Sequence, residues 1–294
     1  MKAELLHRCK DEIGEAATWL DSRKMLLWTD IPNGIVHFYD FQKKYCFETQ
    51  LDGIVSSIIP IKNNPEEVFL TMQNELVRFN LNKKSIEKVF EFNNPNEIRA
   101  NDSKASPEGR LWIGMMNVKK HDKTGSLWSL DSNFTLKKVL DNQCIPNGIV
   151  WNKSGDRMYY ADSGRRCIEE YAYDSESGKI QFIREAISVP NEYGVPDGMT
   201  IDSEGNLWVA HWGGFGVYIW DSLNGKLLYK IEIPVPNVAS CTFGGENNQI
   251  LLVTTACSGL TKNELSEYPL SGSLFFIETD VKGGTNHYPF EIFN

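Results

Sequence analysis

Short apolar segments recur along the chain at nearly regular intervals, bounded by glycine, asparagine or aspartate. Their second residues are 42, 43, 47, 49 and 44 positions apart. A period of roughly 40 to 50 residues is typical of repeat architectures. Six units fit the chain, and their core segments are LLWTD (26–30), VFLTM (68–72), LWIGM (111–115), MYYAD (158–162), LWVAH (207–211) and LLVTT (251–255).

Each unit reads as several short β-strands. Apolar residues alternate with polar ones and do not recur at i, i+3 and i+4 as in helical repeats. A further apolar run follows each core segment, as in IVHFYD (35–40) and VYIWD (217–221). This pattern is typical of a propeller. We therefore predict an all-β, six-bladed β-propeller that spans residues 1–294 as one domain, with ELLHRC (4–9) as a candidate strand for the last blade.

Polar residues share one register in these units. Counting back 11 or 12 residues from each core residue leads to the start of the preceding strand, the innermost of its blade. The residues there are Glu15, Ser57, Asn101, Asn147, Asp197 and Ser240. Because innermost strands surround the channel, equivalent positions on different blades converge. We predict that the four Glu, Asn and Asp side chains meet at one mouth of the channel.

Two carboxylates in a partly dry cavity repel each other unless a cation compensates their charge. An all-oxygen donor set favours a hard divalent metal such as calcium, magnesium or manganese. The alternative is that each residue only starts a strand or occupies a turn, but four at a shared register favour a metal site. Gly148 and Gly198 follow Asn147 and Asp197, where we expect them to allow a tight backbone turn.

Composition narrows the function classes. The net charge of −9 argues against a nucleic-acid partner or an anionic membrane, which require a basic face. No apolar run reaches the length of a membrane helix, and the N-terminus lacks a signal peptide pattern. The six cysteines form no CxxC pair, which suits reduced thiols. We expect a cytoplasmic monomer that acts on a small molecule.

Five segments resemble the senescence-marker-protein/gluconolactonase/luciferin-regenerating (regucalcin-like) family over essentially the whole chain. They are GEAATW (14–19), IRANDSKASPEGRLWIGMM (98–116), IPNGIVWNKSGDRMYYADSG (145–164), VPDGMTIDSEGNLWVA (195–210) and VASCTFGGENNQILLVTTA (238–256). The resemblance implies a six-bladed propeller with a divalent metal at one channel mouth. It also implies hydrolysis of sugar-acid lactones, while insect members are linked to luciferin recycling.

The resemblance also implies roles for individual residues. Glu15, Asn147 and Asp197 match the family's metal ligands, and Asp197 matches its general base. Arg99 and Asn101 match residues that contact substrate. Two departures stand out. Ala16 and Ala17 follow Glu15 where the family commonly has GEGPxW, and GMMNVKK (114–120) has Val118 and Lys119 near a substrate-binding glutamate of animal members.

We therefore predict a metal-dependent lactonase that opens a sugar-acid lactone, with one divalent ion. Ca²⁺ is the first expectation, and Zn²⁺, Mn²⁺, Mg²⁺ and Fe²⁺ are alternatives. An esterase or luciferin-regenerating-type hydrolase with a non-sugar substrate, or a non-enzymatic calcium-binding propeller, also fits the fold. The positively charged side chain of Arg99, beside the predicted metal ligands, favours an enzyme. His211 either lines the mouth near Asp197 or is a partly buried histidine at a strand end, and we favour the second interpretation.

Overall fold

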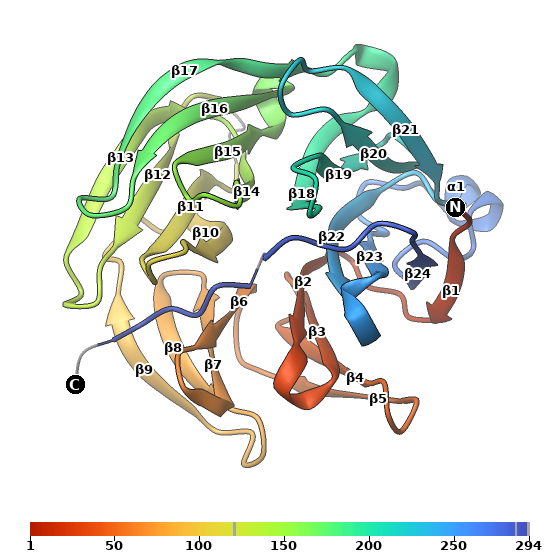
Figure 1. The fold of residues 1–294 in the computed structure, drawn as a ribbon. Coiled ribbons are helices and arrows are strands. Elements are labelled where there is room, and N and C mark those ends of the chain that lie inside the picture. The colour runs from red at the N-terminus through yellow and green to blue at the C-terminus, as the bar shows by residue number, and fades with distance from the viewer. Residues whose placement is uncertain (120–121, 286, 293–294) are drawn as a thin grey trace.

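A computed structural model describes residues 1–119, 122–285 and 287–292, so Lys120 and His121 lie outside it. The described residues form six four-stranded antiparallel sheets, arranged as blades around a central axis (Figure 1). The predicted six-bladed β-propeller is confirmed. Each predicted core segment is the second strand of its blade, where continuous apolar runs are buried on both faces of the sheet.

The first three blades follow one another in chain order from the innermost to the outermost strand. Their strands are β2 (Gly14–Leu20), β3 (Met25–Asp30), β4 (Ile35–Asp40) and β5 (Tyr45–Gln50); β6 (Val55–Ile61), β7 (Asn64–Met72), β8 (Glu75–Asn80) and β9 (Ile86–Glu91); β10 (Ile98–Ala105), β11 (Leu111–Asn117), β12 (Gly125–Leu130) and β13 (Leu136–Gln143).

The last three blades repeat this order, except that the N-terminal strand completes the sixth. Their strands are β14 (Pro146–Trp151), β15 (Arg157–Asp162), β16 (Cys167–Asp174) and β17 (Lys179–Ser188); β18 (Val195–Ile201), β19 (Leu207–Trp212), β20 (Gly216–Trp220) and β21 (Leu227–Glu232); β22 (Val238–Gly244), β23 (Ile250–Thr255), β24 (Leu274–Glu278) and β1 (Glu4–His7). The short helices are η1 (Asp21–Arg23), η2 (Ser163–Arg165), η3 (Asn191–Tyr193), η4 (Glu246–Asn248) and α1 (Lys262–Glu267).

The hydrophobic core lies between neighbouring blades. Phe38 of the first blade faces Phe79 of the second, with 6.2 Å between ring centroids. Trp208 of the fifth blade meets Phe243 of the sixth edge-on at 5.0 Å. Burial decreases outward, since every residue of β3 is buried whereas β9 is mostly exposed. Each blade is therefore held mainly by its two neighbours.

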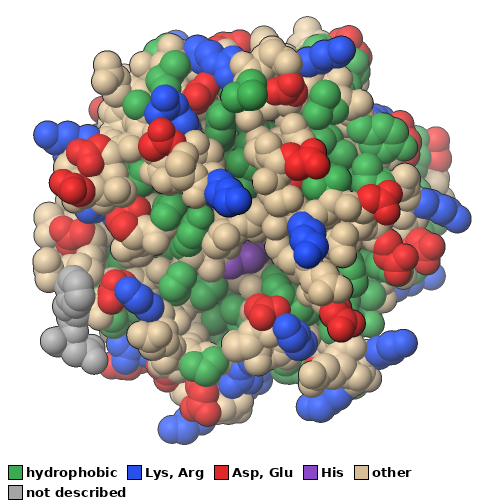
Figure 2. Space-filling model, in the orientation of Figure 1, with side chains coloured by type: hydrophobic (Ala, Val, Ile, Leu, Met, Phe, Trp, Pro, Cys, Tyr) green, Lys and Arg blue, Asp and Glu red, His purple; other side chains and the backbone are tan. Residues whose placement is uncertain are grey.

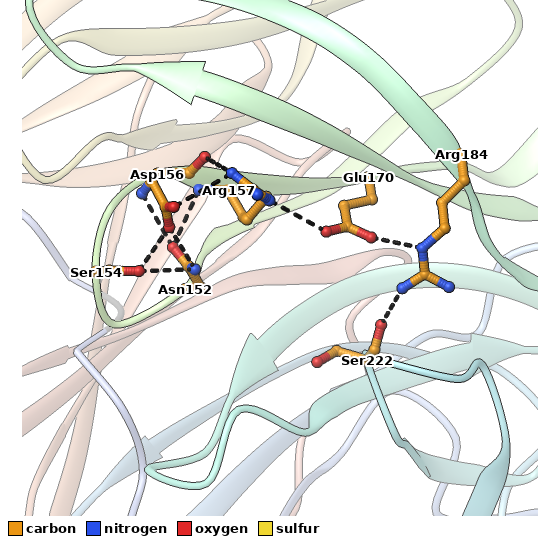
Figure 3. A network of polar contacts seen from close by, with 7 residues as sticks. All are labelled: Asn152, Ser154, Asp156, Arg157, Glu170, Arg184 and Ser222. Atoms are coloured by element: carbon orange, nitrogen blue, oxygen red, sulfur yellow. Dashed lines mark hydrogen bonds and ion pairs between the residues drawn. The ribbon is translucent and has the colours of Figure 1, made fainter.

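Polar contacts reinforce one blade junction at its outer edge (Figure 3). Arg184 of β17 pairs with Glu170 at 2.7 Å and donates to the carbonyl oxygen of Ser222, in the fifth blade. Glu170 also lies 3.5 Å from Arg157, which pairs with Asp156. Because the arginine of each pair is partly exposed, such pairs contribute about 1 kcal/mol or less each.

Strand β1 closes the ring. It pairs with β24, with Glu4 opposite Phe276 and Leu5 opposite Phe275. This pairing confirms the expectation for ELLHRC and joins the first and last strands of the chain within one sheet. Loop closure over such a separation is entropically costly, so the sheet hydrogen bonds of β1 must offset that cost.

The segment that follows β24 crosses the axis over one face of the ring (Figure 1). It forms bridges from Gly283 to Asp202 and from Phe290 to Ile61, at the ends of the inner strands β18 and β6. We call residues 279–285 and 287–292 the C-terminal segment. Acidic and basic side chains are interspersed over this face, and a histidine lies near its centre (Figure 2).

The described residues contain no helix long and apolar enough to cross a membrane. All six cysteines are free thiols, as their spacing predicted. Trp112, Trp151, Trp208 and Trp220 are core residues, also as expected, and Trp128 is half-buried.

Phe290 should be the main anchor of the C-terminal segment. Its side chain is fully buried and meets Phe69 edge-on at 5.4 Å. We expect Phe290→Ala to lower the free energy of unfolding by about 3 to 5 kcal/mol, because it removes a buried ring and leaves a cavity. Urea denaturation would measure this loss. Phe182→Ala is the control, since Phe182 is 54% exposed and should change stability by about 0.5 kcal/mol; equal losses would contradict the assignment.

Candidate active site

The polar residues of the shared register lie together in the structure. Glu15 of β2, Asn101 of β10, Asn147 of β14 and Asp197 of β18 line one cavity of about 420 Å³, with Arg99 beside them. Their side chains are between 5% and 9% exposed, so they are withdrawn from bulk water but face the cavity. The cavity lies on the face of the propeller where the inner strands begin, and the C-terminal segment crosses the opposite face.

A β-bulge follows the same register in each of these four inner strands. The pairing shifts between Glu15 and Thr18 in β2, and between Pro196 and Met199 in β18. The corresponding shifts in β10 and β14 begin at Ala100 and Pro146. Bulges re-aim side chains and occur often beside active sites. The repeated bulge therefore turns four equivalent side chains toward one point.

Two glycines allow the inner strands to approach each other closely. A Cβ atom on Gly148 would lie 2.7 Å from the Asp197 carbonyl oxygen, and one on Gly198 would lie 2.9 Å from the Ser240 Cα atom. Neither glycine adopts a positive φ. The expectation of a tight turn at these positions is therefore wrong. A side chain is excluded there because the neighbouring strand fills the space.

Ala16 has a backbone conformation that glycine adopts more readily than other residues. Its φ is +56°, in the left-handed region, and its N–H donates to Glu15 Oε2 at 2.9 Å. This bond orients one carboxylate oxygen of Glu15. The left-handed conformation thus lets the Ala16 N–H reach Glu15 but strains the backbone at this alanine.

The two carboxylates of the cavity favour their neutral forms. Burial raises the pKa of Glu15, and the nearby Asp102 carboxylate raises it further. Burial also raises the pKa of Asp197 well above its usual range, and the charge of Glu15 adds to this effect. Burial lowers the pKa of Arg99 to about 10, partly offset by the Glu15 charge. Burial is the main cause of all three shifts, so the site disfavours charge of either sign unless an opposite charge compensates it.

Hydrogen bonds fix both asparagine amides. Asn147 Nδ2 donates to Ser163 Oγ at 2.9 Å, and that hydroxyl donates to the Pro196 carbonyl oxygen at 2.6 Å. Asn147 Oδ1 is thereby left as an acceptor for the cavity. In contrast, Asn101 Nδ2 donates to the Pro146 carbonyl oxygen and its Oδ1 accepts from Arg99 Nη1 at 2.8 Å. Asn101 is thus less free to bind a cation than Asn147.

Glu15, Asn147 and Asp197 could therefore present oxygen donors from three blades to one cation. No three His, Cys, Asp or Glu side chains of the described chain form a group that would hold a metal. The predicted set differs from such groups because one of its donors is an amide. Two buried carboxylates with raised pKa values fit a hard cation, whose charge would compensate theirs.

Asp102 and Lys104 lie deeper in the channel and were missed at the sequence level. They line a small internal cavity with Ala16, Ser240 and Cys241. Lys104 Nζ donates to the Met199 carbonyl oxygen at 3.1 Å, and burial lowers its pKa. The i, i+2 spacing of Asp102 and Lys104 was the available signal, because it places both on one face of a strand.

His211 does not line the cavity. It is fully buried, stacks on Tyr218 with 4.0 Å between ring centroids, and Nδ1 lies 2.8 Å from the Tyr193 carbonyl oxygen. The favoured interpretation of a structural histidine fits this position, although its burial is complete. Val118 lines the cavity mouth at 40% exposure, where the resemblance led us to look for a glutamate.

Comparisons with known proteins agree with the geometry. A family model described as SMP-30/Gluconolactonase/LRE-like region matches residues 13–257. The chain belongs to this family. A Bacillus subtilis (strain 168) protein provisionally named sugar lactone lactonase YvrE is 33% identical over 279 residues, 95% of this chain and 94% of that protein. Regucalcin of Homo sapiens is 32% identical over 279 residues, 92% of each chain.

The likeness extends to solved structures. A luciferin-regenerating enzyme matches with a TM-score of 0.91 at 30% identity, and the match covers 98% of this chain and 99% of that one. The resemblance to the SMP-30/gluconolactonase/LRE-like family is thus confirmed over almost the full length. Its lactonase members make a lactone hydrolase the activity to examine.

Ala16→Gly should stabilise this family member by about 0.5 to 1 kcal/mol. Glycine removes the steric cost of the left-handed conformation, although it also increases the entropy of the unfolded chain. Ala17→Gly is the matched control. Ala17 is buried and has no positive φ, so glycine there should destabilise by a similar amount. Thermal denaturation of both variants checks the opposite signs, and a loss of stability in both would refute the strain at Ala16.

His211 should make the fold sensitive to acid. Burial lowers its pKa to about 4, so the unfolded chain binds a proton below pH 6.5 that the folded chain does not. Stability should therefore fall as the pH drops from 6.5 toward 4, by at most about 1.4 kcal/mol per pH unit from this group. His211→Phe should show a shallower decline. Half-buried His287, whose pKa is lowered to about 3, should retain part of it. An unchanged slope in urea titrations would contradict this role.

Proposed function

We propose that this chain is a metal-dependent lactonase that opens a sugar-acid lactone. Glu15, Asn147 and Asp197 would hold one divalent cation, and Arg99 and Asn101 would bind the substrate. The observation that carries this proposal is the pair of buried carboxylates from the first and fifth blades, set beside an oriented amide and a buried guanidinium.

A bound divalent cation would supply Lewis acidity and lower the pKa of a coordinated water from its value of about 15.7 in bulk water. Ca²⁺ suits the all-oxygen donors, and Mg²⁺, Mn²⁺, Zn²⁺ and Fe²⁺ are alternatives. It would also compensate the negative charges of Glu15 and Asp197, whose pKa values are raised by burial first and by neighbouring carboxylates second.

The protein groups would then divide the work of hydrolysis. Asp197 accepts a proton from the attacking water as the water oxygen bonds to the lactone carbonyl carbon. Arg99, already oriented by its bonds to Asn101 Oδ1 and the Ala100 carbonyl oxygen, stabilises the negative charge that develops on the carbonyl oxygen. The bond from the carbonyl carbon to the ring oxygen breaks, and the proton passes from Asp197 to the leaving oxygen. The product is the open hydroxy acid.

The buried position of Arg99 supports an enzyme over a purely calcium-binding propeller. Placing a guanidinium next to a cation site weakens cation binding through like-charge repulsion. Arg99 is 9% exposed and its pKa is lowered, so its desolvation has a cost. An oxygen-rich substrate that bonds to it offsets this cost.

Asp197→Asn should abolish metal-dependent lactone hydrolysis. The variant keeps the shape of the side chain but loses its charge and basicity, so kcat should fall by about 100-fold or more. Chelator-treated protein would be assayed with a panel of aldonolactones before and after adding each metal, and metal affinity would be measured by calorimetry.

Ser240→Ala is the matched control, because Ser240 has the same register in a blade that lacks a proposed ligand. It should keep both activity and metal affinity. Full activity in chelator-treated protein, or in Asp197→Asn, would refute the proposed chemistry. Metal binding without turnover of any lactone would instead favour the non-enzymatic alternative.

A further inference from the structure

The cavity has two layers with different chemistry. Inner strands begin at the mouth, so a residue two positions before a site residue shares its face and lies about 6.6 Å nearer solvent. The residues two positions before Glu15, Asn147 and Asp197 also line the cavity. They are Ile13, Ile145 and Val195. In three blades an apolar layer thus lies between solvent and the polar ring, by which we mean Glu15, Asn101, Asn147 and Asp197.

Residues at or just after the ends of the second strands extend this apolar layer. Ile31 follows β3, Met116 is the last residue but one of β11, and Trp212 ends β19. Ile31 and Met116 are 3% and 5% exposed, so their part of the wall is shielded from solvent. Val118 completes it at the mouth. The upper wall therefore offers a substrate van der Waals contact over most of its circumference.

Polar groups at this upper level are few. Arg99 stands two positions before Asn101, and among the described residues that line the cavity it is the only charged one outside the carboxylate pair. Ser258 adds one hydroxyl. A substrate whose carbonyl and ring hydroxyls face Asp197, Asn101 and Arg99 must place its exocyclic substituent against the apolar wall.

An exocyclic hydroxyl group is poorly matched to that wall. On entry it exchanges hydrogen bonds with water for contact with isoleucine, valine and methionine side chains, which cannot replace them. A methyl group loses nothing in the same place and gains from the removal of apolar surface from water. Apolar pockets reject an added hydroxyl only moderately, by up to about 100-fold.

We propose that the preferred substrate is a deoxy sugar-acid lactone, in which the exocyclic carbon is a methyl group instead of a hydroxymethyl group. This proposal rests on the lactonase function proposed above and names its substrate class. Val195, Ile145 and Ile13 then act as specificity determinants, because they contact the substituent and not the reacting carbonyl.

A pair of lactones that differ by one oxygen atom tests this proposal. D-Fucono-1,5-lactone is D-galactono-1,5-lactone with the hydroxyl of its exocyclic hydroxymethyl group replaced by hydrogen. With the metal-loaded enzyme, kcat/KM for the fuconolactone should exceed that for the galactonolactone by about 10- to 100-fold. Equal values, or faster hydrolysis of the galactonolactone, would overturn the proposal. So would turnover of other aldonolactones without any turnover of the fuconolactone.

Two substitutions test which side chains discriminate. Val195→Thr places a hydroxyl in the upper layer with little change in shape, and should reduce the fucono/galactono ratio at least several-fold, mainly through KM. Val118→Thr at the exposed mouth tests the same effect if Val195→Thr folds poorly. Val89→Thr in the outer strand β9, far from the cavity, is the matched control and should leave the ratio unchanged. An unchanged ratio in both cavity variants would overturn the assignment of the wall.

The two levels of proposal fail differently. If no lactone is hydrolysed with any metal, the lactonase function itself is wrong. If lactones are hydrolysed but the hydroxymethyl compound is preferred, the function holds and only the deoxy substrate class is wrong.

Discussion

The site depends on how closely the inner strands approach one another around the channel. At Gly148 and Gly198 the neighbouring strand already occupies the space of a Cβ atom. This close approach brings equivalent residues of different blades to one cavity, although more than 180 residues separate Glu15 from Asp197 in the chain. The distances between these side chains are thus a property of the ring and not of any single blade.

The same closeness determines the electrostatics of the channel. Glu15, Asp102 and Asp197 bring three carboxylates into a region that holds two basic side chains, Arg99 and Lys104. Burial is the largest cause that raises the pKa of each carboxylate and lowers that of each basic group. All five groups therefore pay a desolvation penalty, and one additional cation would reduce it for the acids. This imbalance supports the proposed metal site as much as the shape of the donor set does.

Sequence periodicity predicted the blades because strand alternation and turn residues are local properties. It also placed Glu15, Asn101, Asn147 and Asp197 at one mouth, since equal offsets in equal repeats give equal positions in the ring. The sequence did not predict the bulges, the left-handed conformation of Ala16 or the path of the C-terminal segment. They arise from packing between blades, which no local pattern records.

Individual residues show the same division. Gly148 and Gly198 were singled out correctly, but their reason is a neighbouring strand and not a turn. Asp102 and Lys104 were overlooked because an acidic and a basic residue two positions apart occur in exposed loops as well as in strands that line a channel. The apolar layer at Ile13, Ile145 and Val195 became visible only once the cavity showed that these residues and the polar ring share one face.

The pairing of β1 with β24 has a consequence for how the protein is made. The blades that carry Glu15, Asn101, Asn147 and Asp197 are all synthesised before residues 274–278, yet the ring closes only when that strand meets β1. Until then the nascent chain has unpaired strand edges and an open channel, which favour association with other chains. The residues of the site are therefore synthesised well before the ring closes, and they can assemble into a site only when synthesis is nearly complete.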